Sequence, residues 1–291
     1  MPVSLFERYS TIFHMCHAIE RVFRYFAQFS YPPTAEEIHT FLSVSVDKHK
    51  LQKELESLLQ NNRIVSREIG GQKHFQLTEH AEHLRAFVRM QKQGLVLFGQ
   101  AKKILQPLHF IPSIWYLGIS GSLSMLSVNN RSDIDIFVIT KAQTIWQSRF
   151  VLLTYKRLLM LLVPRLGRKL CFNLFFAKDG LCLHGNKQSE YIGHELLQLK
   201  PIIDKQHTYD LFKIQNPWIM DLFPNVYINS KREKVQNKSA NQARVSLFIE
   251  KILRNIQMWW LNHKNIKVND FGAQVWFIQD DYEKNIGQRM N

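Results

Sequence analysis

Two aspartates one residue apart, Asp133 and Asp135, constrain the fold of this chain more than any other feature of its sequence. They lie in the stretch from Ser132 to Thr140, whose apolar residues are typical of a β-strand. Because side chains alternate across a strand, both carboxylates are expected on one face, while Ile134 and the alternate residues after it enter a core. Two carboxylates this close repel by about 4 kcal/mol at an effective dielectric of about 20, and a shared cation offsets that repulsion. We therefore expect a divalent metal site, and oxygen ligands alone select a hard ion such as Mg²⁺.

A turn of small residues precedes this strand. Residues 114–118 are strand-like and run into Ile119-Ser-Gly-Ser122. Glycine in such a turn lets backbone N–H groups approach a ligand closely, and an anion can bind there at the start of the following helix. The hydroxyl of Ser122 is a further possible donor. Gly121 and Ser122 are therefore predicted to bind phosphate groups.

A Gly-Ser turn, about ten connecting residues and an Asp-x-Asp strand together resemble the nucleotidyltransferase superfamily typified by DNA polymerase beta and the aminoglycoside nucleotidyltransferases. The resemblance implies a mixed α/β fold in which Gly121 and Ser122 hold the triphosphate of an NTP. It also implies that Asp133 and Asp135 hold Mg²⁺. Three later segments resemble a bacterial branch of uncharacterised proteins with this domain: residues 170–176, 216–218 and 223–225.

One position departs from the family pattern. Family members generally carry a third carboxylate on a later strand, and the matching strand here, residues 169–177, has Asn173 at that place. The third acid commonly binds the metal that activates the attacking hydroxyl, or acts as its base. Asn173 therefore leaves nucleotide binding intact and leaves open whether the chain is an enzyme. Three later acids could take the place of the missing one: Asp179, Glu190 and Glu195.

Composition limits the class of protein. With 291 residues, 45% of them hydrophobic, the chain can bury a substantial core in two domains. Its three cysteines lack Cys-x-x-Cys spacing, which favours reduced cytoplasm over a disulfide framework or a zinc site. The N-terminus lacks a signal-peptide pattern, and the most apolar stretch, residues 150–163, is too short and too charged to span a bilayer. We expect a cytoplasmic protein without a membrane partner.

The net charge of +14 is concentrated in two stretches. Residues 141–170 contain seven basic residues and no acid, and residues 231–267 contain nine basic residues and two acids. A polyanionic partner such as RNA, DNA or the nucleotide itself is one interpretation, and solvated helix faces are the other. Arg149 lies near the start of a helix predicted over residues 144–163 and is a candidate for contacting the triphosphate.

The first 80 residues are predicted to form a separate domain. Thr34 and Glu37 have the spacing of a capping box that opens the second of three helices, and Gly70-Gly71 joins two extended segments in a hairpin. This order resembles a winged helix-turn-helix, whose third helix enters a major groove. The helices are expected at 14–29, 35–41 and 45–60, and the extended segments at 63–69 and 73–77.

The third of these helices carries the residues that would decide its role. Lys48, Lys50 and Lys53 are expected on its exposed side and favour contact with nucleic acid. Glu54 and Glu56 favour a winged helix used for protein docking or dimerisation instead. Both interpretations stay open.

The expected organisation has four parts. The winged helix covers residues 1–80, a connecting helix 81–108, the nucleotidyltransferase domain 109–228, and a C-terminal helical segment 229–291 that begins with a polar linker at 229–241. The expected reaction transfers a nucleoside monophosphate from NTP to an unknown hydroxyl acceptor with Mg²⁺. The alternative is a DNA-binding regulator that binds NTP without turnover. His80 and His83, one turn apart, are interpreted as polar surface rather than as metal ligands.

Overall fold

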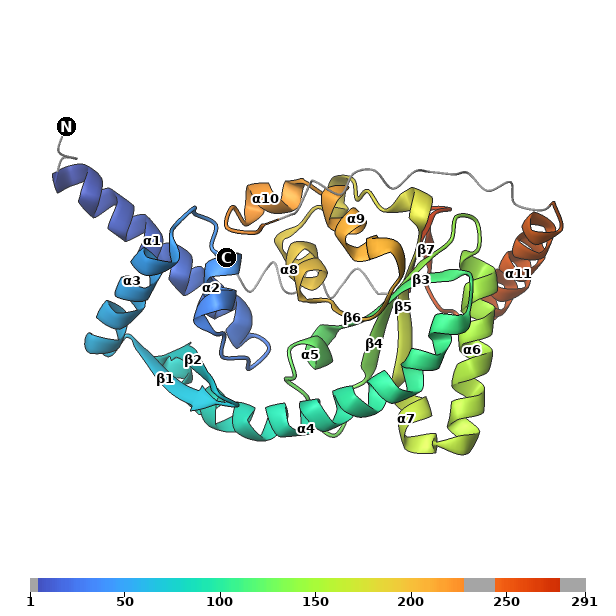
Figure 1. Ribbon diagram of the computed structural model, residues 1–291, viewed down its shortest axis with the longest axis horizontal. Helices are drawn as coiled ribbons and strands as arrows, with labels where there is room; N and C mark the ends of the chain where they lie inside the picture. The colour runs from blue at the N-terminus through green and yellow to red at the C-terminus, as the bar shows by residue number, and fades with distance from the viewer. Residues whose placement is uncertain (1–4, 228–243, 278–291) are drawn as a thin grey trace. The chain divides into compact units, whose positions relative to one another are not determined.

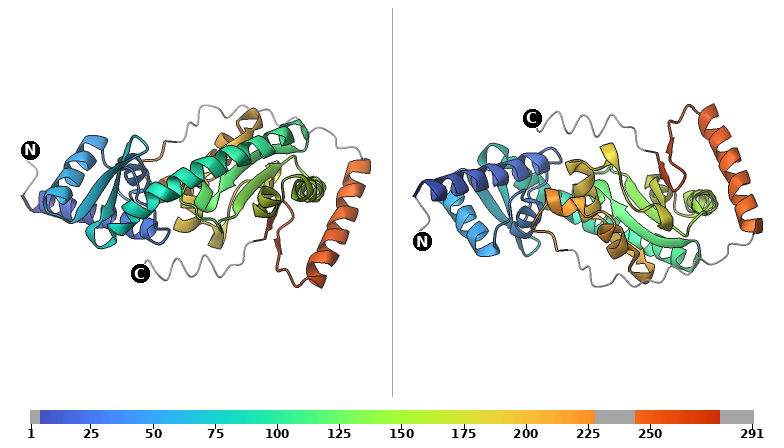
Figure 2. Two further views of the ribbon diagram at one scale, coloured as in Figure 1. Left: turned by 90° about the horizontal axis from the view of Figure 1, so that it is seen from below. Right: turned by 90° about the horizontal axis from the view of Figure 1, so that it is seen from above.

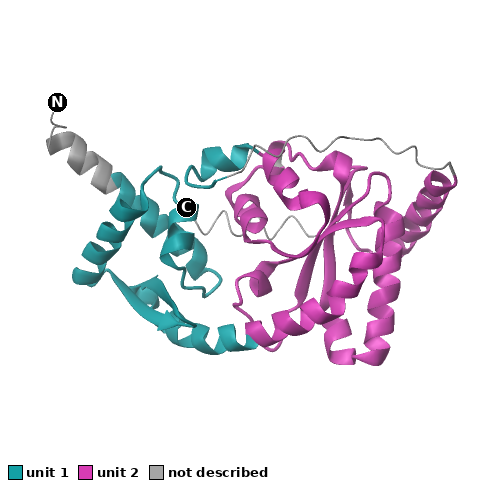
Figure 3. Cartoon of the chain, in the orientation of Figure 1, with its two compact units in different colours: residues 1–93, 217–227, 285–291 teal, residues 94–216, 228–284 magenta. Residues whose placement is uncertain are grey.

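The computed structural model describes residues 5–227 and 244–277, which fall into two compact units (Figure 1 and Figure 3). Unit 1 combines the chain up to residue 93 with residues 217–227, and unit 2 combines residues 94–216 with the described residues after 243. The boundary between residues 93 and 94 falls within helix α4 (Glu82–Leu105). The division into units differs in its bounds from the four expected parts 1–80, 81–108, 109–228 and 229–291.

Unit 1 is a helical region with a β-hairpin. The predicted capping box is confirmed, because Thr34 Oγ1 accepts from the Glu37 N–H at 3.3 Å and Glu37 Oε2 accepts from the Thr34 N–H at 2.8 Å. The third helix begins later than predicted, because Asp47 caps it by accepting from the Lys50 N–H at 2.9 Å. The elements are α1 (Leu5–Ala27), α2 (Ala35–Phe41), α3 (Lys48–Gln60), β1 (Ile64–Ile69) and β2 (Gln72–Leu77).

Residues 217–227, which the sequence assigned to the domain starting at residue 109, pack with the N-terminal helices of unit 1. Asn225 accepts from the Val46 N–H at 3.0 Å and donates to the backbone oxygens of His39 and Val44 at 3.0 and 2.9 Å. The ring of Phe223, just after α10 (Trp218–Leu222), meets the ring of Phe41 edge on at 5.3 Å. The amide of one asparagine thus fixes the loop that follows α2.

Unit 2 contains a mixed sheet of six strands within the described residues, in the order β6-β3-β4-β5-β8-β7. Only β4 and β5 run parallel, and α6 (Ile145–Leu162) and α7 (Pro164–Lys169) connect them. The expected mixed α/β class is confirmed. The strands are β3 (Ile114–Ser120), β4 (Ile134–Thr140), β5 (Leu170–Ala177), β6 (Lys200–Asp204), β7 (Asn269–Asp270) and β8 (Gln274–Trp276).

Helices cover both faces of this sheet (Figure 1 and Figure 2). One face meets α4, α6 and α11 (Arg244–His263) in a core that includes Ile134, Ile136 and Val138, as predicted. The other face meets α9 (Thr208–Ile214) through aromatic pairs such as Phe137 and Phe212, whose ring centroids are 5.3 Å apart, and α8 (Glu190–Gln198) lies on the same side, where Glu195 accepts from the Gly121 N–H. Asp135 therefore belongs to the face that α8 and α9 cover.

The predicted C-terminal helical segment at 229–291 is wrong for two strands, β7 and β8, and β6 was not predicted from the sequence either. β6 is an edge strand that contains Pro201, a residue that argues against a strand in sequence. β7 and β8 are too short to show alternation. The expected polar linker at 229–241 lies outside the described residues. In the part of the chain that is described, no helix combines the length and apolarity needed to cross a bilayer.

Candidate active site

The turn at Gly121 lies directly against Asp135. Ser120, the last residue of β3, pairs with Asp135 of β4, and the short helix α5 (Gly121–Ser124) follows at once. Gly121 has a φ of +61°, and a Cβ built on it would lie 2.9 Å from Asp135 Oδ2. Only glycine fits both constraints. The structure therefore brings Gly121 and Asp135 together, with Ser122 next to Gly121 in α5.

Asp133 immediately precedes β4, which begins at Ile134, so only Asp135 of the pair belongs to the strand itself. Asp133 is exposed and Asp135 is partly buried. Burial raises the pKa of Asp135, and the charge of Asp133 raises it further. The charge of Asp133 thus disfavours the ionised form of Asp135, which is the repulsion that a bound cation offsets.

Asn173 of β5 lies beside Asp135. Its Nδ2 donates to Asp135 Oδ1 at 2.6 Å, and its Oδ1 accepts from Cys171 Sγ at 2.8 Å. The thiol and the carboxylate together set the orientation of the amide. Asn173 therefore supplies a neutral donor that holds Asp135, where an acid would add a third negative charge.

Glu195 of α8 is the acid that the fold brings to the site. The Gly121 N–H donates to Glu195 Oε2 at 3.4 Å, which places this carboxyl on the turn that also meets Asp135. Burial raises the pKa of Glu195 to about 7, and the charge of Asp135 adds to that rise. Asp179, by contrast, follows the far end of β5, and Glu190 lies in the first turn of α8. Only the packing of α8 distinguishes Glu195 from these two acids.

Arg149 is not brought to this site. It is buried in α6, on the sheet face opposite Asp135, where its Nη1 donates to Gln257 Oε1 at 2.6 Å. Its guanidinium lies over the ring of Phe277, 4.3 Å from the centroid. Burial lowers the pKa of Arg149 to about 10. This arginine joins α6 to α11 and is not positioned to contact a triphosphate at Gly121.

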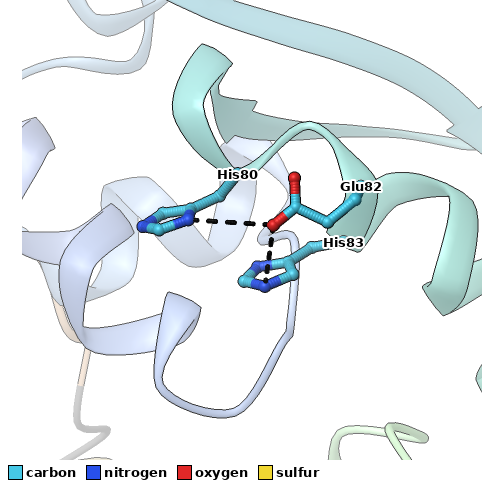
Figure 4. A group of neighbouring side chains, drawn as sticks. All are labelled: His80, Glu82 and His83. Atoms are coloured by element: carbon cyan, nitrogen blue, oxygen red, sulfur yellow. Dashed lines mark ion pairs between the residues drawn. The ribbon is translucent and has the colours of Figure 1, made fainter.

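A second cluster of potential ligands, His80, Glu82 and His83, lies in unit 1 (Figure 4). Their ligand atoms lie within 4.8 Å of one another, the only such group of three in the part of the chain that is described. The two imidazole rings stack with planes only 7° apart, and one nitrogen of each ring lies near Glu82 Oε1, at 3.9 Å for His80 Nδ1 and 3.7 Å for His83 Nε2. His83 Nδ1 also lies 3.4 Å from Gln76 Nε2. The arrangement is that of stacked polar groups around a surface carboxylate.

Comparisons of the chain with protein-family models, with curated proteins and with solved structures give no match. The function must therefore be inferred from the residues of the chain. The strongest starting point is the glycine turn between Asp135 and Glu195, which places a backbone N–H at the start of α5 beside acids from two separate elements.

Proposed function

We propose that this chain is a nucleotidyltransferase that transfers a nucleoside monophosphate from an NTP to a hydroxyl acceptor with Mg²⁺. The observation that carries the proposal is the contact of the Gly121 turn with two acids, Asp135 at its Cβ position and Glu195 at its N–H. In this proposal unit 2 is the nucleotidyltransferase domain and unit 1 is a winged helix. The assignment of unit 1 rests on its order of three helices and a hairpin. The assignment of unit 2 rests on the Gly-Ser turn and the Asp-x-Asp motif.

Asp133 and Asp135 would hold the Mg²⁺. The donor set fits this ion, because both are carboxylates and Asp135 is partly buried beside a second anion, which raises its pKa. Asn173 holds Asp135 Oδ1 by a hydrogen bond, so the carboxylate plane is fixed before any ion binds. When bound, Mg²⁺ neutralises charge on the triphosphate and on the departing pyrophosphate.

Gly121 and Ser122 would bind the phosphates. The Gly121 N–H now donates to Glu195 over a long 3.4 Å contact and can donate to a phosphate oxygen instead. Glu195 would then be released to act on the acceptor. In this proposal, binding of the nucleotide at the turn therefore exposes a base.

In the transfer step, Glu195 accepts the proton of the acceptor hydroxyl while the oxygen of that hydroxyl attacks the α-phosphorus. The new bond forms between the acceptor oxygen and phosphorus, and the bond to the bridging oxygen of pyrophosphate breaks. A positioned base of this kind contributes about 10²–10⁴-fold to the rate. Positioning and charge neutralisation supply most of the remainder.

A second candidate is a regulator that binds NTP without turnover and acts through unit 1. The observation that favours it is Asn173, which gives the site a hydrogen-bond donor where the family generally has an acid. In that case Glu195 remains a ligand of the Gly121 N–H and no proton acceptor is needed. The two candidates differ in pyrophosphate release.

The test measures pyrophosphate released by the purified chain with Mg²⁺ and each NTP, with and without RNA, alongside calorimetric titration of Mg-NTP. The Asp133→Asn/Asp135→Asn variant should lose Mg-dependent NTP binding. Glu195→Gln should keep binding and lose about 10²–10⁴-fold in turnover. Asp179→Asn, which changes an acid outside the site, is the matched control.

The outcomes separate the candidates. NTP binding that needs both aspartates, without release of pyrophosphate by the wild type, favours the regulator. Binding that is unchanged in the double aspartate variant contradicts both. Release of pyrophosphate by the wild type favours the enzyme. In that case, the molecule in a cell extract that receives label from α-labelled NTP is the acceptor.

A further inference from the structure

Helix α6 exposes an apolar face on the side opposite the sheet. Leu152 and Leu159 are buried against the sheet, whereas Leu161 is 80% exposed and Leu162 is 69% exposed. A helix with apolar residues on both sides normally has both sides covered. The exposed residues recur at helical spacing along its length: Phe150, Val151, Leu158, Leu161 and Leu162.

Cations without acids accompany this apolar stripe. Arg157 lies within it, and Arg165 and Arg168 of α7 follow its C-terminal end, all three exposed. No Asp or Glu occurs between residues 141 and 170. We call the five apolar residues and three arginines the outer face of α6 and α7.

Helix α11, which packs on the start of α6, repeats this pattern. Phe248, Ile256 and Trp259 are 65%, 57% and 69% exposed and lie on one side of the helix. Lys264 and Lys267 follow its end and are exposed. Tryptophan at the end of an apolar stripe, followed by lysine, is typical of segments at a membrane interface.

We propose that the outer face of α6 and α7 docks on the surface of an anionic phospholipid bilayer. The leucines and Phe150 would enter the boundary between headgroups and acyl chains, and the arginines would pair with headgroup phosphates. The chain would lie on the bilayer, in keeping with the lack of a spanning helix among its described residues. This docking revises the sequence-based expectation of no membrane partner, which rested on the lack of a spanning segment.

Charge and apolarity together favour this partner over two others. A second copy would bring the same arginines against an acid-free face, so like charges would oppose pairing. A nucleic acid would satisfy the arginines but offers aliphatic side chains such as Leu161 and Leu162 no apolar surface of comparable area. An anionic bilayer satisfies both kinds of residue at once.

The test is sedimentation of the full chain with vesicles of phosphatidylcholine, with or without phosphatidylglycerol. The wild type should bind the anionic vesicles only, and less at high salt. Leu158→Gln/Leu161→Gln/Leu162→Gln should abolish binding, and each of Arg157→Gln, Arg165→Gln and Arg168→Gln should weaken it about fivefold. Because the triple variant could fail to fold, thermal melts of all variants are recorded. The single variant Leu161→Gln, at the most exposed position of the face, is also tested for vesicle binding.

Matched controls change residues of the same kind elsewhere in unit 2. Phe110→Gln removes an aromatic side chain that is 86% exposed, and Lys102→Gln/Lys103→Gln removes two exposed cations of α4. These variants should bind as the wild type does. The proposal is overturned if the wild type ignores anionic vesicles, or if the leucine variants bind vesicles normally. It is also overturned if the leucines instead support self-association or binding to a nucleic acid without vesicle binding.

Discussion

At the scale of residues, the hydrogen-bonded chain of Cys171, Asn173 and Asp135 decides how the site responds to an added charge. Asn173→Asp would replace the donor to Asp135 with a second anion, so we expect lower stability at neutral pH by about 1–3 kcal/mol. Turnover should fall rather than rise, because Glu195 already supplies the carboxylate that accepts the proton. Thermal melts with and without Mg²⁺, together with pyrophosphate release, measure both effects. Asn130→Asp adds the same charge at an exposed position and is the control. A variant more active than the wild type would contradict the role given to Glu195.

Glu195 also predicts how stability depends on pH. Burial raises its pKa from the ordinary 4.5 to about 7. Between these values the folded chain binds a proton that the unfolded chain releases, so the free energy of unfolding falls as pH rises. We expect the Tm of the metal-free protein to fall through this window and Glu195→Gln to reduce the slope. Asp204 and Glu250, whose pKa values burial also raises, account for a residual slope. A melting profile identical to the wild type in Glu195→Gln would contradict this prediction.

The site was predictable from sequence where its residues are local and unpredictable where they depend on packing. Gly121 directly follows β3, and Asp133 and Asp135 lie at the start of the adjacent strand β4, so their spacing along one short connection sufficed to place them together. Glu195 reaches Gly121 only because α8 packs over α5, and no local pattern separates it from Glu190. Arg149 has the right charge in the right stretch, but the alternation of β4 places α6 on the other side of the sheet.

At the scale of elements, α6 is capped by another helix. No side chain of its own caps it, and Glu250 of α11 accepts instead from the backbone N–H groups of Trp146 and Gln147 at 2.8 and 2.9 Å. We expect Glu250→Ala to lower the free energy of unfolding by about 1–2 kcal/mol, measured by urea denaturation. Lys251→Ala, at the next and exposed position, should change it little. Equal midpoints for the two variants would show that the cap is dispensable.

The role of α3 is a prediction of the same scale. Lys48 pairs with Glu36 at 2.7 Å and Lys50 approaches Asp47 at 3.7 Å, so part of the positive charge of this helix is already offset. If unit 1 binds duplex DNA, the affinity of the full chain should fall steeply with salt, and Lys48→Glu/Lys50→Glu/Lys53→Glu should abolish binding. Lys102→Glu/Lys103→Glu in α4 is the control. Binding that is absent or insensitive to salt would favour protein docking.

Elements with caps and turn signals were predicted closely, and the short strands of the later chain were not. The capping box of Thr34 and the Gly70-Gly71 turn are local signals that the fold keeps. Each of the strands β6 and β8 exists because a longer strand of the sheet offers it an unpaired edge. A strand of three to five residues that forms through such pairing is too short to show alternation of apolar and polar residues in the sequence.

At the scale of the whole molecule, net charge overstates the surface available to a polyanion. Arg149 is buried against Gln257, and Lys169 Nζ donates to the backbone oxygens of Asn130 and Ser132 at 2.9 and 2.7 Å. Arg149 thus joins α6 to α11, and Lys169 joins the end of α7 to the loop before β4. The charge of the acid-free stretch is thus divided between internal contacts and the exposed arginines of α6 and α7.

The sheet of unit 2 also has an order of assembly in time. β5 pairs on one side with β4, which precedes it, and on the other with β8, which is made only after α8, β6, α9, α10 and α11. A ribosome that adds residues one by one therefore leaves the β8 side of β5 unpaired while most of the later chain is still being synthesised. That side is the backbone edge of an apolar strand that contains Phe175 and Phe176, the kind of edge that other chains can join. Slow synthesis beyond β5 would lengthen the interval in which neighbouring nascent copies can aggregate.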